Sequence, residues 1–419
     1  MFALIDASGM YASCEKVFDP SIRNRPVVVL SNNDGCIVAV CPIAKKLGIP
    51  KFQPYFKLKP KLDELGVVAR SSNYELYSDL SQRMMNICAR FAPEQHIYSI
   101  DENFLSYGHY VPKEGWLAHG KEIRRAVWRE TRLPVGVGFG CTLTLAKAAN
   151  HASKRISGYQ GVAVIASESE RVHILQNMLV SDVWGIGRRI SKRLALQGID
   201  TAWQLSKAMP SIIKKDFSIL IAHTVHELNG NQRFSWDEVK APKKQIFSTR
   251  SFGKRVTSIL DLKQAIIMHC GIASKKLRNQ NSQTLNIIVF AHNSIHDKEP
   301  FFRRAAIHQF SCPTSDSGVI SSAAGKLVDQ IFKPGIRFYK AGIGLLEIVD
   351  EKPNQQDLFA VSNDRPNLMT CMDGINDRYG RNTIFIAGQG IEQKFAMRRE
   401  LLSPRYTTRL AELPIFRCN

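Results

Sequence analysis

The chain has 419 residues, too many for one hydrophobic core, so we expect three or four folded units. Its hydrophobic content of 44% and charged content of 22% are those of an ordinary soluble globular protein, and it has no apolar run of about 18 residues that could span a membrane. Lys and Arg number 57 against 37 Asp and Glu, a net charge of +20 that favours nucleic acid as a partner over an anionic membrane or an inert basic surface.

The first 165 or so residues alternate between strand-like and helix-like patterns. The stretch FALI reads as a buried strand that stops at Asp6, and Thr142 can cap a helix running to Lys154. This alternation predicts an α/β or α+β domain. The expected strands are 2–5, 25–32, a pair within 96–107, and 133–140; the expected helices are 10–17, 76–92, 121–131 and 143–154.

The remainder of the chain changes in its predicted secondary structure from one segment to the next. Residues 180–230 have helical patterns throughout and predict a small helical domain. A polar segment with Pro242 follows, and strands then return over 246–348 with helices expected at 260–279 and 321–332. Residues 349–367 are polar and contain proline, which indicates a flexible connector, and the last 50 residues are short, basic and without a clear pattern.

The cysteines and the first residues indicate the compartment. The nine cysteines include no CxxC pair, and Cys36 and Cys41 have no accompanying His/Cys cluster, so a zinc site is not expected. The opening stretch MFALIDAS lacks the basic start and long apolar core of a signal peptide. We therefore expect reduced thiols in a cytoplasmic protein without membrane contacts; a place on the nucleoid is expected only from the family resemblance described below.

The stretch IYSIDENF places two acids, Asp101 and Glu102, at the tip of an expected hairpin. Asp6 also closes an apolar strand, so three carboxylates could meet at neighbouring strand ends. Carboxylates without basic neighbours repel one another and need cations, and their hard oxygen atoms suit magnesium in pairs, the usual device for phosphoryl transfer. Surface acids at a hairpin turn are the alternative that spacing alone leaves open.

The glycine-rich stretch GVGFG invites a comparison with nucleotide-binding loops. It lacks the GxGxxG spacing of a dinucleotide site, and the following GCTLT lacks the Gly-Lys-Ser/Thr of a phosphate-binding loop. Neither type of site is therefore expected here.

An ordered set of motifs resembles the Y-family, or translesion, DNA polymerases, and in particular the UmuC-type catalytic subunit of bacterial DNA polymerase V and its plasmid-borne relatives. The resemblance covers essentially the whole chain. It rests on Asp6 with Tyr11, SSNYELYSDLSQRMM, YSIDENF, VGVGFGCTLTLAKAANHASK, VWGIGRRISKRL, residues 249–255, YKAGIGL and AGQGI with LLSPRYTTR.

This resemblance implies an α+β multidomain, right-hand polymerase that extends a primer with dNTPs in error-prone translesion synthesis during the SOS response to DNA damage. It further implies primer–template DNA, a processed UmuD-like dimer, RecA and the β sliding clamp as partners. The implied parts are a palm (1–18 and 76–166), fingers (19–75), a helical thumb (167–232), a linker (233–245), a little finger (246–350) and a C-terminal tail (351–419).

The resemblance also implies roles for individual residues. Asp6, Asp101 and Glu102 would hold two Mg²⁺ ions, with the Ala7 carbonyl as a further ligand, and Tyr11 would be the steric gate against a ribose 2′-hydroxyl. Lys45 and Lys154 match the residues that contact the triphosphate. Two departures are Pro42, where many members have Tyr beside the second basic residue, and Ser8, where a second acid is common.

Two further motifs are expected to bind macromolecules. The turn with Gly185 and Gly187 resembles a helix–hairpin–helix, in which backbone N–H groups meet a DNA phosphate, and three basic residues add charge. In the polar connector, QQDLF matches the pentapeptide that binds the sliding clamp. The basic residues are Arg188, Arg189 and Lys192, and the pentapeptide is Gln355, Gln356, Asp357, Leu358 and Phe359.

Two alternatives from other functional classes remain open at this level. A metal-dependent nuclease would use the same carboxylates but would not need Tyr11 as a sugar gate. A non-catalytic DNA-binding scaffold would use only the basic surface.

Overall fold

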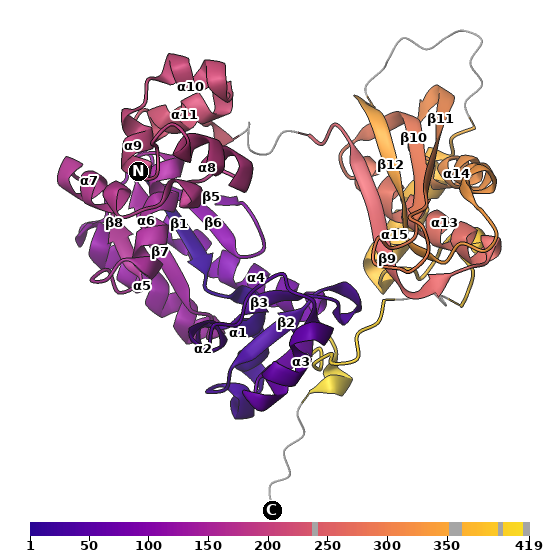
Figure 1. Cartoon of the computed structure of the whole chain (residues 1–419), viewed down its shortest axis with the longest axis horizontal. Helices are drawn as coiled ribbons and strands as arrows, with labels where there is room; N and C mark the ends of the chain where they lie inside the picture. The colour runs from indigo at the N-terminus through magenta and orange to yellow at the C-terminus, as the bar shows by residue number, and fades with distance from the viewer. Residues whose placement is uncertain (237–241, 352–362, 393–396, 414–419) are drawn as a thin grey trace, which may run out of the picture. The chain divides into compact units, whose positions relative to one another are not determined.

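The computed structural model describes residues 1–236, 242–351, 363–392 and 397–413. The chain forms two compact units: residues 1–240 with residues from 399 onward, and residues 241–398 (Figure 1). Among the described residues, no helix is long and apolar enough to cross a membrane.

The first unit is built on a five-stranded sheet of order β5-β6-β1-β7-β8. Its central strand, β1, pairs antiparallel with β6 on one side and β7 on the other, and its residues 3–5 and Ala7 are buried. The strands are β1 (Phe2–Ala7), β5 (Glu94–Ile97), β6 (Glu102–Ser106), β7 (Val135–Gly140) and β8 (Val162–Val164).

Two helices cover opposite faces of this sheet: α5 (Gly115–Thr131) and α6 (Leu143–Arg155). The glycines of GVGFG explain how closely α6 approaches, because a Cβ at Gly138 would lie only 2.0 Å from a backbone nitrogen of α6. On the other face, the Phe139 ring lies against Gly120 of α5. The glycine-rich stretch therefore serves helix–strand packing rather than nucleotide binding.

A smaller sheet of order β3-β2-β4 lies in the same unit with four helices. Val27–Leu30 is completely buried, as its unbroken apolar sequence requires. The strands are β2 (Val27–Leu30), β3 (Ile37–Val40) and β4 (Val68–Ser71). The helices are α1 (Met10–Phe18), α2 (Pro42–Lys46), α3 (Tyr55–Glu64) and α4 (Tyr74–Cys88), with short 3₁₀ helices η1 (Pro20–Ile22), η2 (Asn32–Asp34) and η3 (Ala89–Phe91).

The helical part of the first unit packs beside α6. Buried Glu227 joins the two, since its carboxylate accepts from the backbone N–H of Thr144 in the first turn of α6, where the helix dipole favours negative charge. The elements are α7 (Glu168–Gln176), η4 (Val180–Asp182), α8 (Arg188–Ala195), α9 (Ala202–Lys207), α10 (Pro210–Asp216) and α11 (Ile219–Leu228).

The second unit is a four-stranded antiparallel sheet of order β11-β10-β12-β9 with α13 and α14 on one face. Helix α15 joins it through an ion pair between Arg278 and Asp373 at 2.7 Å and through the buried Met369. The elements are β9 (Ile246–Val256), α13 (Ile259–Arg278), β10 (Ser282–His292), β11 (Arg303–Thr314), α14 (Ser317–Ile331), β12 (Phe338–Asp350), α15 (Pro366–Tyr379) and η5 (Ala387–Gln389); η6 (Leu410–Glu412) belongs to the first unit.

The structure corrects several of the expected boundaries, and two helices begin earlier than expected: α5 at Gly115 rather than at residue 121, and α14 at Ser317 rather than at residue 321. Strand β1 does not stop at Asp6 but continues through Ala7, because both residues pair with β7. Helix α4 ends at Cys88 and a 3₁₀ turn follows it. The last 50 residues, which showed no clear pattern, include most of the 14-residue helix α15. The QQDLF pentapeptide lies outside the described residues.

Candidate active site

The two acids Asp6 and Glu102 lie directly opposite each other on neighbouring strands. They form the last pair in the antiparallel ladder of β1 and β6, so their side chains leave the same face of the sheet, the one covered by α6. Asp101 precedes the first residue of β6, in the turn that joins β5 to β6. The sheet thus brings acids from residue 6 and residues 101–102 to one edge.

Hydrogen bonds hold the turn with Asp101 against β1. The Ala7 N–H donates to the Asp101 carbonyl oxygen at 2.9 Å. The Ser99 hydroxyl donates to the Asp101 carboxylate at 2.6 Å and accepts from the Glu102 N–H at 3.1 Å. The backbone position of both acids is therefore set by local contacts.

Two lysines of α6 face these carboxylates. Lys154 Nζ lies 2.6 Å from Asp6 Oδ1, and Lys147 Nζ lies 2.8 Å from Glu102 Oε1. The two lysines are seven positions apart, close to two helical turns, so they share one face of α6. Burial raises the pKa of Asp6, Lys154 opposes this, and the charge of Asp101 raises it further.

A cavity of about 310 Å³ lies among these groups, lined by Asp6, Glu102, both lysines and Trp184. Lys147 Nζ is 4.6 Å from the centre of the Tyr98 ring and 5.2 Å from that of Trp184, both within cation–π range. Asn150 donates to the Leu4 and Gly136 carbonyls at 3.0 and 2.9 Å, which fixes α6 on β1 and β7.

The carboxylate oxygens of Asp6, Asp101 and Glu102 are ligands that suit a hard cation. In this structure Asp6 and Glu102 are ion-paired with lysines. Among the described residues, no three Asp, Glu, His or Cys side chains are grouped as a ready metal site. The ammonium groups of Lys147 and Lys154 instead supply the positive charge that Glu102 and Asp6 require. The charge of Asp101 lies close enough to Asp6 to raise the pKa of Asp6, and carboxylates gathered this closely are a fit environment for divalent ions once the ammonium groups move aside.

Tyr11 lies on α1, directly after the turn that ends β1. Its half-buried ring stacks on Tyr77 with ring centres 4.6 Å apart and planes at 15°, and meets Tyr74 edge-on at 5.9 Å. Burial raises the pKa of Tyr11, and the negative charge of Asp101 contributes to the same shift. An aromatic ring and an acid of the candidate site therefore share one electrostatic environment.

The other expected triphosphate contact, Lys45, lies exposed on α2. Loss of hydration and the like charges of Arg155 and Lys51 lower the pKa of Lys45. Arg155 also lines the 310 Å³ cavity beside Lys154. The positive charge of Arg155 on α6 thus repels that of Lys45 on α2, as expected where cations gather around an anion-binding site.

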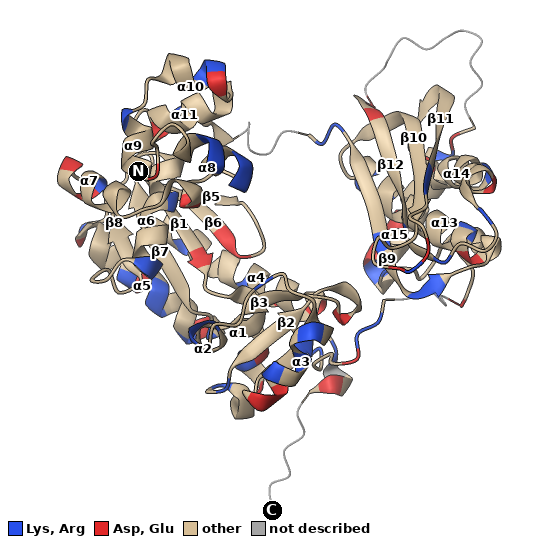
Figure 2. Ribbon diagram, viewed as in Figure 1, with Lys and Arg blue, Asp and Glu red and all other residues tan. Residues whose placement is uncertain are grey.

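The turn with Gly185 and Gly187 connects η4 to α8, so the helix before it is a single 3₁₀ turn. Gly185 has φ of +86°, which favours glycine, and a Cβ at Gly187 would meet open space. Figure 2 shows α8 as a basic helix. All four of its basic residues are exposed, the three expected to bind DNA and also Arg193: Arg188, Arg189, Lys192 and Arg193.

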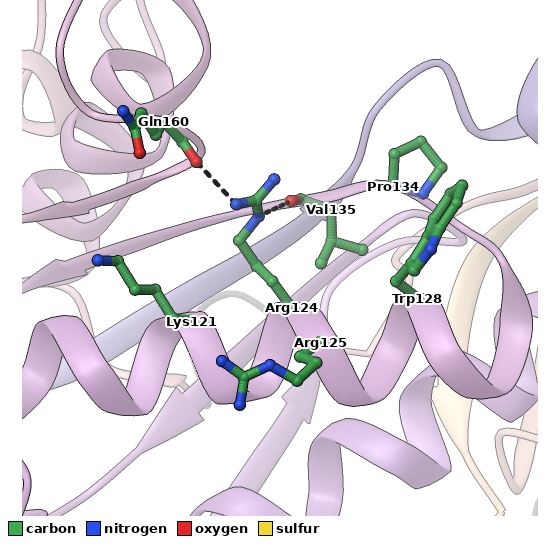
Figure 3. Close-up of a pocket in the computed structure, with 7 residues that line it drawn as sticks. All are labelled: Lys121, Arg124, Arg125, Trp128, Pro134, Val135 and Gln160. Atoms are coloured by element: carbon green, nitrogen blue, oxygen red, sulfur yellow. Dashed lines mark hydrogen bonds between the residues drawn. The ribbon is translucent and has the colours of Figure 1, made fainter.

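A second cavity, of about 570 Å³, lies against α5, and Figure 3 shows its lining. Arg124 is engaged there with the carbonyl oxygens of Val135 and Gln160 at 2.9 and 2.7 Å. No acid occurs among the described residues that line it, so it does not share the chemistry of the carboxylate site.

Sequence reasoning missed Lys147, Asn150 and Arg155. The signal was available, because 147, 150, 154 and 155 follow helical spacing within the segment already expected to be a helix. Reasoning from Lys154 alone left this basic face of α6 unrecognised.

Comparison with known proteins identifies the family. Residues 5–151 match the impB/mucB/samB family, residues 243–358 match the C-terminal domain of that family, and residues 366–415 match a domain of unknown function. The chain is 42% identical over 418 residues to Protein UmuC of Salmonella typhimurium, and 40% identical over 419 residues to Protein MucB of Escherichia coli, with 99% of each chain covered in both cases. It is 25% identical over 392 residues to DNA polymerase IV of Bacillus anthracis, covering 90% of each chain.

Solved structures show the same fold. A Y-family DNA polymerase chimera of Dbh and Dpo4 matches with a TM-score of 0.64 at 20% identity, and an insertion ternary complex of Dbh DNA polymerase matches with a TM-score of 0.54 at 19% identity. Each covers 84% of this chain and 100% of its own. The chain therefore belongs to the Y-family DNA polymerases, in the group of UmuC-type catalytic subunits.

Proposed function

We propose that Asp6, Asp101 and Glu102, with the Ala7 carbonyl, hold two Mg²⁺ ions at the active centre of this polymerase. The chain is an error-prone, DNA-directed DNA polymerase of the translesion class, a metal-dependent nucleotidyltransferase that uses primer–template DNA and dNTPs. The observation that carries the proposal is the direct pairing of Asp6 with Glu102 on the face covered by α6, beside the turn with Asp101.

The ions, when bound, would neutralise the triphosphate and lower the pKa of the primer 3′-hydroxyl. The chain's own residues bind and orient the nucleotide. Lys154, with Lys45 from α2, attracts the phosphates, and the 2.6 Å contact of Lys154 with Asp6 places its ammonium at the acids before substrate arrives. Tyr11 excludes a ribose 2′-hydroxyl by its bulk.

We assign the parts of a right hand to the two units. The five-stranded sheet with α4, α5 and α6 would be the palm, the small sheet with α2 and α3 the fingers, and α7 to α11 the thumb. The four-stranded sheet of the second unit would be the little finger. The linker and tail follow the bounds 233–245 and 351–419 expected from the sequence.

Contacts with DNA would use backbone phosphates rather than bases. In the thumb, consecutive phosphates of one DNA strand would be bound by two sets of groups. These are the N–H groups of the turn at Gly185 and Gly187 and the side chains of Arg188, Arg189 and Lys192. Such contacts position a duplex without reading its sequence, which suits an enzyme that copies any template.

Partners would reach the chain through its C-terminal tail, residues 351–419. The likeness to UmuC supports association with a processed UmuD-like dimer, and we extend the proposal to RecA and to the β sliding clamp. The clamp would be bound by Gln355 to Phe359, a pentapeptide outside the described residues. Induction in the SOS response and a place on the nucleoid in the cytoplasm belong to the same proposal.

Primer extension tests the assignment of the acids. The full chain is given a primed template and dNTPs, and the Asp6→Asn and Glu102→Gln variants are compared with Asp63→Asn, which alters an exposed acid on α3. The two site variants should lose extension by at least about a thousandfold, because each removes a charge that the ions require. The Asp63→Asn control should retain it.

The same assay separates the other functional classes. Nucleotide-dependent growth of the primer supports polymerase action, shortening of the primer would indicate a nuclease, and no change would indicate a scaffold. A template with an abasic site, copied with and without the UmuD-like dimer and RecA, then tests bypass and its dependence on partners. Full activity of Asp6→Asn would refute the metal assignment.

A further inference from the structure

A short segment near the C-terminus binds the first unit beside the nucleotide-site aromatics, and we call residues 400–404 the strap. The strap is hydrogen-bonded to the last residue of β4: the Ser71 N–H donates to the Leu401 carbonyl, and the Leu401 N–H donates to the Ser71 hydroxyl, both at 2.9 Å. The Glu400 N–H donates to Asp34 at 2.9 Å. These bonds fix the backbone of the strap.

The strap then enters the protein at Ser403, which is 4% exposed. Asn73, fully buried, donates from its side-chain amide to the Ser403 carbonyl at 3.1 Å, the Ser403 hydroxyl at 2.9 Å and the Pro404 carbonyl at 3.2 Å. Asn73 is also the N-cap of α4, since its side-chain oxygen Oδ1 accepts from the Leu76 N–H. One side chain therefore joins the strap to the start of α4.

The Ser403 hydroxyl continues the connection to α1. It donates to the carboxylate of Glu15 at 3.1 Å, and the Tyr77 hydroxyl donates to the same oxygen at 2.5 Å. Glu15 is 1% exposed, and burial raises its pKa. A buried carboxyl needs such donors, so removing one leaves part of its hydrogen-bonding capacity unsatisfied and weakens the hold on Glu15.

The connection ends at Tyr11. Tyr77 is completely buried, and Tyr11 stacks on it at 4.6 Å, so the position of the Tyr77 ring determines where the Tyr11 ring can lie. The Tyr77 hydroxyl is held by Glu15, and Glu15 is held by Ser403. Tyr11 lies on α1 and Tyr77 on α4, and the strap thus connects these two helices through hydrogen bonds.

We propose that the strap is a positioning element for sugar selection: through Ser403 and Asn73 it holds the Tyr77 ring, and through that ring it sets the position of Tyr11. This inference rests on the proposed role of Tyr11 as the steric gate. It gives the C-terminal segment, which matches a domain of unknown function, a part in nucleotide selection 390 or so residues away from the gate in sequence.

The test compares dNTP and rNTP incorporation by the full chain under single-turnover conditions. Two variants release the strap: Ser403→Ala removes the bond to Glu15, and Asn73→Ser removes the amide donor while keeping an N-cap oxygen. In each, discrimination between dNTP and rNTP should fall about fivefold or more, the factor expected for loss of one buried hydrogen bond. The matched control is Ser206→Ala, which removes an equally buried hydroxyl that donates to the Trp203 carbonyl in α9.

The ratio of the two sugars separates positioning from general damage. A variant that is merely less stable loses both activities together and leaves the ratio unchanged, whereas a displaced gate changes the ratio. Ser403→Thr, which keeps the hydroxyl, should restore discrimination to within about twofold of the natural chain.

Parallel measurement of Tyr11→Ala keeps the outcomes distinct. If Tyr11→Ala loses discrimination while Ser403→Ala and Asn73→Ser retain it, the strap inference is overturned and the gate assignment stands. If Tyr11→Ala itself retains discrimination, the gate assignment fails and the strap inference fails with it. Loss in all three, with Ser206→Ala unchanged, supports the inference.

Discussion

The close approach of α6 to β7 leads to a sharp prediction for Gly138→Ala. The added Cβ would lie 2.0 Å from the Asn150 backbone nitrogen and 2.6 Å from both the Ala146 carbonyl oxygen and the Ala149 carbonyl carbon. All three are backbone atoms of a helix, so no side chain can rotate to make room. The helix itself must withdraw by roughly 1.4 Å before ordinary contact is restored.

This displacement should cost stability and activity together. Overpacking of a well-packed core costs about 1–3 kcal/mol, and a contact made only with backbone belongs at the upper end of that range. About 3 kcal/mol corresponds to a fall of roughly 6–12 °C in Tm for a unit of this size. Because α6 carries Lys147 and Lys154, a shift of about 1 Å should also reduce incorporation by roughly a hundredfold.

Thermal unfolding followed by circular dichroism, together with single-nucleotide incorporation, measures both effects. Gly35→Ala is the control within the same unit, since its Cβ would meet its nearest neighbour at 3.5 Å and its φ is −76°. A Gly138→Ala protein that melts within about 2 °C of the natural chain and incorporates nucleotides at its rate would refute the proposed dependence of the site on this packing.

Three other predictions concern pH, DNA and nucleotide. Burial, with the charges of Arg250 and Lys276, lowers the pKa of His269 to about 4. Between pH 6.5 and 4, His269 is therefore protonated in the unfolded chain but neutral in the folded one. Stability should therefore fall by about 3 kcal/mol between pH 6.5 and 4, and denaturant unfolding of His269→Phe should lack that component. Replacing Arg188, Arg189 and Lys192 together by Ala should reduce the slope of log affinity for DNA against log salt by about 2–3; an unchanged slope would exclude phosphate contact. Lys154→Ala should raise the KM for dNTP about tenfold or more in steady-state kinetics, and an unaltered KM would count against the triphosphate contact.

The sequence was most informative where function depends on local pattern. The hairpin of IYSIDENF was expected from its apolar alternation, and the structure has β5 and β6 there with Asp101 and Glu102 where the second strand begins. Apolar strands that end in acids were enough to suggest convergence, because neighbouring strand ends share one edge of a sheet. Spacing could not show that Asp6 and Glu102 are directly paired, since register depends on the whole ladder.

Long-range contacts explain what the sequence did not reveal. Asn73 and Ser403 are 330 residues apart, and neither carries a local pattern that predicts the other. Helix α15 was not expected because it buries little apolar surface of its own and is held through the ion pair of Arg278 with Asp373. Structure that depends on such distant partners is invisible to periodicity within one segment.

The most direct test of the account is a crystal structure of the full chain with primer–template DNA, a non-hydrolysable dNTP and Mg²⁺. We predict two ions bound by carboxylate oxygens of Asp6, Asp101 and Glu102 and by the triphosphate, with the ammonium groups of Lys147 and Lys154 moved off those carboxylates. A triphosphate seated elsewhere, with both lysine–carboxylate contacts intact, would contradict it.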